Sequence, residues 1–313
     1  MSLNVKSPVL ATAAVGERTR ASTVNIKPGW SRDMQDFTQF EFSTTGSPSR
    51  LVYRKGQGPA VVLMHELPGM IPECVDLARR IADRGFTVYL PLLFGEPNLP
   101  LSPLKMLQYT AQLCLSHEFY CFAKHQSSPI TDWLRSLCRK AHEECGDRGV
   151  GVIGMCLTGG FVLSLMADES VIAPVASQPS LPFGITPGHR AALGISPEEL
   201  KRAKARSQQG VPLLALRFSE DNISPPAKVD SLRREFGGTP EVIEDSQELC
   251  WKRGQMLETI EINSGTGNPF GIPKNSHAVL TLGFQEQKDH PTNRVFERVI
   301  EFLQAQFGKP IAS

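Results

Sequence analysis

Apolar runs and helical patterns alternate along most of the chain. Runs rich in branched aliphatic residues predict buried strands at 60–66, 86–91, 149–154, 171–177, 211–219 and 255–263. Apolar residues at helical spacing predict helices at 72–85, 131–146, 197–210 and 292–308, with another helix directly after Cys156. Segments 37–42 and 49–55 flank a turn rich in Gly, Ser and Pro and predict a hairpin. We therefore expect an α/β fold, with a mostly parallel sheet covered by helices on both faces.

The domain organisation follows from where this alternation begins and ends. Residues 1–34 lack hydrophobic periodicity and predict a flexible N-terminal arm, and 309–313 form a short tail. Between them, 35–308 contain no convincing linker, so we expect one domain. Residues from about 95 to 130 begin with prolines and continue as a helical pattern, which predicts an inserted helical cap over the ligand pocket.

One uncharged stretch, 149–167, is long enough to span a bilayer. Five of its nineteen residues are glycine, and Gly159 and Gly160 are adjacent near its middle. A strand, a turn and a helix explain this composition better than one continuous membrane helix.

The charges of the chain are nearly balanced. Lys and Arg number 33 and Asp and Glu number 32, which gives a formal net charge of +1. A nucleic-acid or anionic-membrane binder would carry a clear basic excess, so we expect neither partner. Seven cysteines occur without a tight spacing code and no secretory signal is recognised, so we expect a reduced, cytoplasmic protein. Arg, Ser and Thr in the first thirty positions leave an organelle-targeting segment as the alternative.

Residues capable of nucleophilic catalysis lie just past the predicted strands, where ligands bind in parallel sheets. Cys156 follows 149–154, Asp221 follows 211–219, and His277 lies in a polar loop after 255–263. This order of nucleophile, acid and base is the chain order of the α/β-hydrolase triad. Glu220 is an alternative to Asp221 as the acid, and His65 is an alternative to His277 as the base.

The surroundings of Cys156 match a nucleophile elbow, a sharp turn from strand to helix. Gly154 stands two residues before the cysteine, where only a small residue avoids a clash in such a turn. The elbow raises the nucleophile above the sheet and directs the N–H of the next residue toward the developing oxyanion.

These motifs together resemble the dienelactone hydrolase family, whose members are cysteine hydrolases on the α/β-hydrolase fold. The family elbow is glycine, any residue, cysteine, leucine and two glycines, and this chain has Gly-Met-Cys-Leu-Thr-Gly-Gly at 154–160. The family also has a strand ending in glutamate, an aspartate often followed by proline, and a histidine near the C-terminus before an apolar helix. Glu66, Asp221 and His277 match these three positions, and the resemblance covers roughly 35–308.

The resemblance implies hydrolysis of an ester, lactone or thioester bond through an acyl-enzyme intermediate. Cys156 would attack as the thiolate, His277 would transfer the proton, and Asp221 would orient the imidazole. The main-chain N–H groups of Leu157 and Leu67 would form the oxyanion hole. A thiolate suits activated esters better than amides. The expected partner is a small-molecule ester or lactone, and a homodimer is possible.

A glutamate at the position of Glu66 is tied to the resting cysteine in the family. We therefore hypothesise that Glu66 keeps Cys156 protonated until substrate displaces it, which would protect the thiol from oxidation. The alternative is a structural carboxylate that pairs with Arg or Lys. Family members that act on dienelactones hold the substrate carboxylate with arginines, but 94–96 and 278–281 contain none. We expect a less anionic substrate.

Two alternatives from other functional classes remain open. The chain could be a non-enzymatic thiol redox sensor, or an inactive protein with a hydrolase fold. The second possibility is a Cys/His metal site in the helical insertion and the helix after it, formed from Cys114, His117, Cys121, His125, Cys138, His142 and Cys145. Zinc-ligand spacing is usually tighter than this, so we expect neither a metal nor a cofactor.

Overall fold

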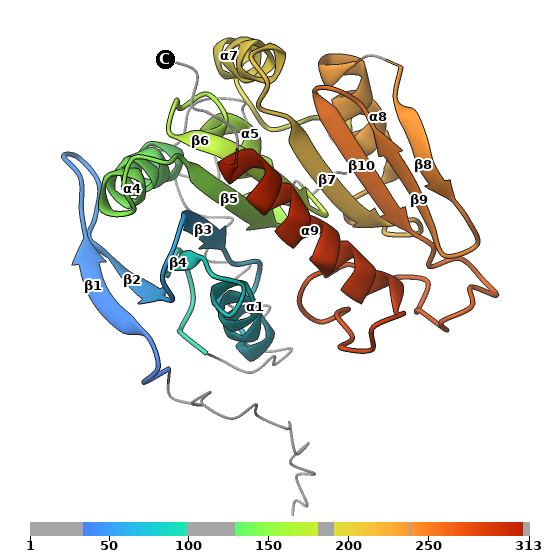
Figure 1. Cartoon of the computed structure of the whole chain (residues 1–313), viewed down its shortest axis with the longest axis horizontal. Helices are drawn as coiled ribbons and strands as arrows, with labels where there is room; N and C mark the ends of the chain where they lie inside the picture. Colours follow the sequence, from blue (N-terminus) through green and yellow to red (C-terminus); the bar gives the residue numbers. More distant parts are fainter. Residues whose placement is uncertain (1–33, 99–128, 181–190, 238, 309–313) are drawn as a thin grey trace, which may run out of the picture.

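A ten-stranded sheet runs through the computed structural model, which describes residues 34–98, 129–180, 191–237 and 239–308 (Figure 1). In spatial order the strands are β1-β2-β4-β3-β5-β6-β7-β10-β9-β8. Their bounds are β1 Thr38–Phe42, β2 Arg50–Lys55, β3 Ala60–Met64, β4 Thr87–Pro91, β5 Val150–Met155, β6 Val171–Ser177, β7 Leu213–Phe218, β8 Glu241–Asp245, β9 Leu249–Arg253 and β10 Leu257–Ile262.

The six central strands, from β4 to β10 in spatial order, pair in parallel. The hairpin β1–β2 and the pair β9–β8 extend this sheet at its two edges with antiparallel pairing. The mostly parallel sheet and the opening hairpin are therefore confirmed. Strands β8 and β9 had no counterpart in the prediction, because they lie toward one edge of the sheet and each combines two or three apolar residues with charged ones, which gives no continuous apolar run.

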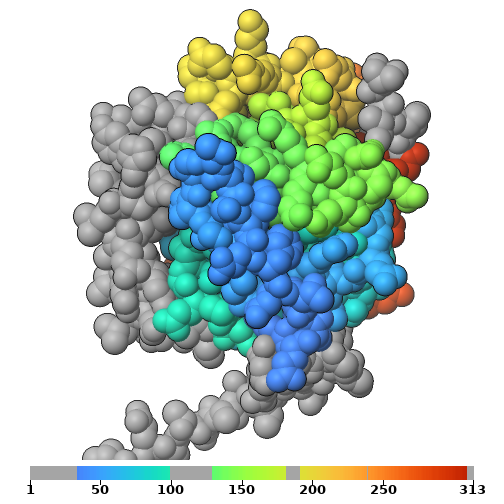
Figure 2. Space-filling view, turned by 90° about the vertical axis from the view of Figure 1, so that its left-hand side faces the viewer, coloured from blue at the N-terminus to red at the C-terminus, as the bar shows by residue number. Residues whose placement is uncertain are grey.

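Helices cover both faces of the sheet, as predicted. Helices α1 (Pro72–Ala82) and α9 (Pro291–Phe307) contribute to the apolar core on one face. The helices that contribute to the core on the opposite face are α4 (Pro129–Glu144), α5 (Leu157–Leu165), α7 (Pro197–Gln208) and α8 (Pro226–Phe236). Figure 2 shows a face of the molecule on which the hairpin β1–β2 and α4 are exposed. The buried Trp133 of α4 donates a 3.1 Å hydrogen bond from its indole nitrogen to the main-chain oxygen of Phe42 at the end of β1, which joins the helix to the hairpin.

Several predictions lie wholly or mostly outside the described residues. The N-terminal arm, the tail at 309–313 and most of the cap at about 95–130 belong to this group and stay predictions. No helix in the described ranges is long and apolar enough to cross a membrane. The stretch at 149–167 instead contains β5, a sharp turn and α5, in agreement with the prediction.

Candidate active site

The candidate residues lie beyond the carboxyl ends of neighbouring parallel strands. Cys156 separates β5 from α5, Asp221 follows β7, and His277 lies in the loop after β10. Glu66 follows β3, which pairs with β5. The strand order therefore brings loops that are far apart in the sequence together at the carboxyl ends of the central strands, where parallel α/β folds place their ligands.

Cys156 occupies a strained turn, which we call the elbow (residues 154–158). Its backbone dihedrals are φ 56° and ψ −120°, in a region that residues other than glycine rarely adopt. A Cβ at Gly154 would lie 2.2 Å from the main-chain oxygen of Thr158, so glycine is required there for the turn to close. The main-chain N–H of Cys156 donates to Ser177 at the end of β6, at 3.1 Å. The elbow is thus fixed by close packing and by the neighbouring strand.

Thr158 is the elbow residue that departs from the family pattern, either as an insertion or in place of the first glycine. Its hydroxyl oxygen accepts a 2.9 Å hydrogen bond from the N–H of Met155. The same hydroxyl lies 3.1 Å from the main-chain oxygen of Met64 and 3.2 Å from that of His65. The side chain therefore joins the elbow to the end of β3.

Asp221 and His277 form a close pair. The Nδ1 atom of His277 lies 2.7 Å from Oδ2 of Asp221, which is buried. The other carboxylate oxygen accepts hydrogen bonds from the N–H groups of Ile223 at 2.8 Å and Ser224 at 3.1 Å. Glu220 instead lies 3.8 Å from the Lys274 ammonium. Of the two predicted acids, Asp221 is therefore the one that contacts His277.

The electrostatics of His277 favour a protonated ring. Burial alone would lower the pKa of His277, but the negative charges of Cys156 and Asp221 and hydrogen bonding to them raise it to about 11. The Nε2 atom is buried and has no hydrogen bond of ordinary geometry within the described residues. This nitrogen is therefore free to exchange a proton with a group that enters the site.

His65, the predicted alternative base, serves a different role. Its Nε2 atom accepts a 3.0 Å hydrogen bond from the N–H of Leu93, and its Nδ1 atom lies 3.2 Å from the main-chain oxygen of Glu66. The ring is fully buried, and burial lowers the pKa of His65 to about 4. Both nitrogens are thus engaged by the main chain, and the neutral ring holds two loops together.

Glu66 is buried, but its hydrogen bonds do not go to Cys156. One carboxylate oxygen accepts from the Thr281 hydroxyl, and the other accepts from the Gln178 amide at 3.2 Å. Burial raises the pKa of Glu66, and these hydrogen bonds and the charge of His277 partly oppose that effect. In this structure the carboxylate therefore links the turn after β6 to the loop that carries His277, and the expected bond to the cysteine is not present.

Two main-chain N–H groups remain available at the predicted oxyanion-hole positions. Leu157 is the first residue of α5, so its N–H has no acceptor inside the helix. Leu67 follows Glu66 in the loop after β3. In the described part of the chain, neither N–H has a main-chain acceptor. Both predicted oxyanion-hole residues therefore retain a donor for a ligand.

The prediction did not include Ser180, although this residue contacts the sulfur directly. Its Oγ atom lies 3.1 Å from Sγ of Cys156, and its N–H donates to the main-chain oxygen of Cys156 at 3.0 Å. Ser180 lies three residues beyond 171–177, so the strand-end rule could have identified it. Gln178 could have been found in the same way, at the position that follows this strand.

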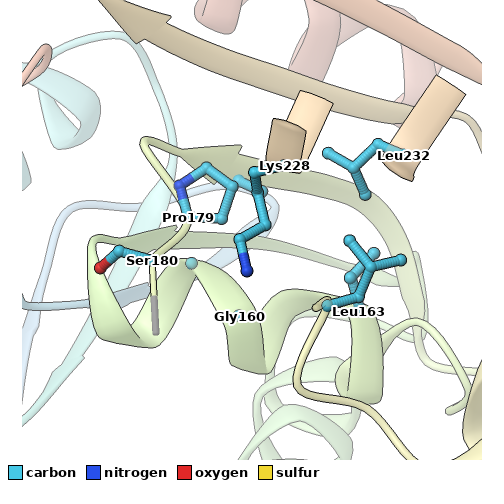
Figure 3. Close-up of a pocket in the computed structure, with 9 residues that line it drawn as sticks. Gly160, Leu163, Pro179, Ser180, Lys228 and Leu232 are labelled. Carbon is cyan, nitrogen blue, oxygen red and sulfur yellow. The ribbon is translucent and has the colours of Figure 1, made fainter. Parts of the chain in front are cut away.

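A small cavity lies behind the elbow, between α5 and α8 (Figure 3). Its volume of about 10 Å³ suits a single water molecule. Lys228 lines it and donates a hydrogen bond to the main-chain oxygen of Ala192. Burial lowers the pKa of Lys228 to about 8. Figure 3 shows the Ser180 hydroxyl pointing away from Lys228 and the cavity that the two residues share.

The metal-site alternative finds no support in the described residues, which contain no cluster of three possible ligands. Cys138 is buried in the apolar core, and the Cys145 sulfur lies 3.7 Å from the Tyr89 hydroxyl. His142 accepts a 3.0 Å hydrogen bond from the N–H of Gly149. The other four residues of that alternative lie outside the described ranges.

Comparison with known proteins agrees with this architecture. The model of the dienelactone hydrolase family matches residues 48–241, which is more than half of the chain. No curated protein matches the chain in sequence.

Solved structures provide a further comparison. An esterase of Pyrococcus furiosus has 13% identity, with coverage of 90% of this chain and 96% of that chain and a TM-score of 0.53. Est1E of Butyrivibrio proteoclasticus has 11% identity, coverage of 87% and 99%, and a TM-score of 0.52. A dienelactone hydrolase-like promiscuous phosphotriesterase from metagenomic libraries has 16% identity, coverage of 87% and 100%, and a TM-score of 0.50. At such low identities, these similarities show the fold alone.

Proposed function

Because the chain belongs to the dienelactone hydrolase family and is a hydrolase of ester or lactone bonds, we propose that Cys156, His277 and Asp221 carry out its reaction. In this proposal the bond cleaved is an ester, lactone or thioester of a small molecule. The reaction passes through a thioester between Cys156 and the acyl group of the substrate.

The first half of the reaction transfers the acyl group to the enzyme. The Cys156 thiolate attacks the carbonyl carbon, a C–S bond forms, and the carbonyl oxygen becomes an oxyanion. The N–H groups of Leu67 and Leu157 donate hydrogen bonds to that oxygen. Collapse of the intermediate breaks the bond to the leaving group, which takes a proton from Nε2 of His277.

The second half of the reaction releases the acid. The neutral His277 ring takes a proton from water, and the hydroxide attacks the thioester carbonyl. The C–S bond then breaks, the sulfur leaves as a thiolate, and the imidazolium is restored. Asp221 holds Nδ1–H at 2.7 Å through both halves and so keeps Nε2 directed at the reacting groups.

The substrate class is narrowed by the absence of arginine at 94–96 and 278–281. Without a guanidinium at either place, a carboxylate has no bidentate partner there. Phe94 instead packs its ring edge-on against His65, with the ring centroids 4.4 Å apart. These residues support an ester or lactone that carries less negative charge than a dienelactone.

The main observation behind the proposal is that Nδ1 of His277 lies 2.7 Å from Oδ2 of Asp221. The negative charge of Cys156 also raises the pKa of His277, so the imidazole interacts with both the proposed acid and the proposed nucleophile. The test is hydrolysis of p-nitrophenyl esters by the wild type and by Cys156→Ala. We expect the variant to lose the activity while it keeps the fold. Cys250→Ser is the matched control, because Cys250 lies on β9, four strands away from β5 in the sheet. An active Cys156→Ala variant would refute the proposed nucleophile, and selective alkylation of Cys156 without any esterase activity would favour a thiol sensor.

A further inference from the structure

Ser180 is buried and lies directly against the proposed nucleophile. Its hydroxyl oxygen is 3.1 Å from Sγ of Cys156, and its N–H holds the main-chain oxygen of the same residue. We propose that Ser180 is a catalytic residue whose hydroxyl donates a hydrogen bond to the Cys156 thiolate. The inference rests on the proposed function, since it assigns the group that stabilises the attacking sulfur.

The Ser180 hydroxyl is suited to both states of the sulfur. A hydroxyl has one donor and two acceptor positions, so it accepts from a neutral thiol and donates to a thiolate. Within the described residues, Sγ of Cys156 is its hydrogen-bond partner. Glu66 does not compete for the sulfur, because its two carboxylate oxygens accept from Thr281 and Gln178.

A chain of hydrogen bonds fixes the position of Ser180. The preceding residue, Pro179, accepts a 2.8 Å hydrogen bond from the hydroxyl of Ser224. The N–H of Ser224 in turn donates to Oδ1 of Asp221 at 3.1 Å. The turn after β6 and the loop after β7 are thereby joined, and Ser180 is held beside the sulfur by the same loop that orients the imidazole. A donor placed on such a support loses little freedom when it engages a charge.

The strength of the hydrogen bond from Ser180 to the Cys156 sulfur changes during the reaction, while the hydroxyl proton stays on Ser180. The hydrogen bond to sulfur is strongest while Cys156 carries its negative charge. It weakens when the C–S bond to the acyl group forms, because the sulfur is then neutral. It strengthens again when water has attacked the thioester and the sulfur leaves as a thiolate. Ser180 therefore favours thiolate formation at the start and release of the acid at the end.

The test measures the thiolate itself, without a substrate. The full-length wild type, Ser180→Ala and Ser180→Gly are treated with iodoacetamide over a range of pH, and modification of Cys156 is followed by mass spectrometry. Ser207→Ala is the control, because Ser207 is equally buried but donates to Val211 at 3.0 Å, after α7.

Loss of the hydroxyl is expected to move the midpoint of the alkylation profile by about one unit to higher pH, with about tenfold slower reaction below it. Ser207→Ala is expected to follow the wild type. Ser180→Gly removes the hydroxyl without adding an apolar group, and it decides the question if Ser180→Ala does not fold. An unchanged profile in a folded Ser180 variant would overturn the inference.

The two proposals fail in different ways. If Cys156→Ala still hydrolyses esters, the proposed function is wrong, whatever the alkylation profiles show. If Cys156→Ala is inactive and the Ser180 variants react like the wild type, only the role of Ser180 is wrong.

Discussion

The hydroxyl oxygen of Thr158 lies 3.1 Å from the main-chain oxygen of Met64, so one side chain joins the elbow to the end of β3. Replacement by valine keeps the shape but leaves the Met155 N–H without its 2.9 Å acceptor. We expect Thr158→Val to lower the free energy of unfolding by about 1–3 kcal/mol, measured by urea denaturation. We also expect kcat/KM to fall by about tenfold to a hundredfold, because the elbow positions the reacting sulfur.

Thr158→Ser is the matched control, because it retains the hydroxyl. It is expected to keep most of the kcat/KM that Thr158→Val loses. Equal kinetics for the serine and valine variants would show that the contact with Met64 does not position the elbow.

The backbone of Cys156 predicts an unusual order of stability among its variants. With φ at 56° and ψ at −120°, a residue that has a Cβ stores about 1–3 kcal/mol of strain. Glycine relieves this strain but costs about 0.5–1 kcal/mol of additional chain entropy. We therefore expect Cys156→Gly to exceed Cys156→Ala by about 1 kcal/mol in the free energy of unfolding.

The control for this comparison is Cys138, which lies inside helix α4. There the glycine variant should be less stable than the alanine variant by about 1 kcal/mol, because a helix interior disfavours glycine. If the alanine variant were the more stable at both positions, the elbow would hold no strain that glycine relieves.

The sequence predicted most of the sheet because its central strands are buried and apolar. The run at 171–177 coincides with β6, and the run at 60–66 extends only two residues beyond β3. Strands β8 and β9 have partly exposed, charged residues, and they form because β9 pairs with β10 and β8 pairs with β9. Such strands depend on tertiary pairing and leave little trace in a periodicity pattern.

The candidate site was predictable to the extent that strand ends determine it. Cys156, Asp221 and His277 each follow a predicted strand, and in the structure they follow the carboxyl ends of the central strands β5, β7 and β10. The contacts of Ser180 depend on the turn after β6, where Gln178 has a φ of 35°. Glu66 accepts hydrogen bonds from Thr281 and Gln178 and not from Cys156, because those two donors lie within reach of its carboxylate. These choices are made by side-chain geometry, which the order of motifs does not specify.

Arg217 supports the loop that carries Asp221. This fully buried side chain donates to the main-chain oxygens of Ser224 at 2.8 Å and Asp221 at 3.3 Å, and it pairs with Glu261 at 2.5 Å. Arg217→Met would leave the main-chain oxygens of Ser224 and Asp221 without this donor, while Glu261 would keep its pair with Arg233 at 3.0 Å. We expect a loss of about 1–3 kcal/mol in the free energy of unfolding, measured by urea denaturation.

The matched control is Arg84→Met, just after α1. The Arg84 side chain is 40% exposed and pairs with Glu297, whose side chain is 42% exposed. An exposed pair of this kind contributes about 1 kcal/mol or less, so this variant should unfold close to the wild type. A similar loss for both variants would mean that burial of Arg217 adds nothing to its support of the loop.

Glu66→Gln separates a structural carboxylate from a group that controls the thiol. A glutamine directs an amide N–H₂ at one of the two donors, Thr281 or Gln178, which the carboxylate now accepts. We expect the free energy of unfolding to fall by about 1–3 kcal/mol. We expect the rate of Cys156 oxidation by hydrogen peroxide to stay unchanged, because Glu66 does not bond to the sulfur. Faster oxidation in a folded Glu66→Gln variant would instead show that Glu66 protects the thiol.

The raised pKa of His277 predicts how stability depends on pH. The pKa rises from 6.5 in the unfolded chain to about 11 in the folded state, because the charges of Cys156 and Asp221 outweigh burial. A group whose pKa is raised on folding contributes stability that is complete below the unfolded value and is lost as the pH rises through the folded value. The contribution of His277 is therefore complete below about pH 6.5 and decreases toward about pH 11.

This dependence is measured by urea unfolding of the wild type and His277→Gln between about pH 6 and about pH 10. The wild type is expected to have its largest advantage at the acidic end, and the advantage should shrink steadily as the pH rises. Repeating the pair in a Cys156→Ala background removes one of the charges that raise the pKa, so the slope should become shallower. An advantage that grows with pH, or an unchanged slope without Cys156, would show that the sulfur and His277 do not interact as a charged pair.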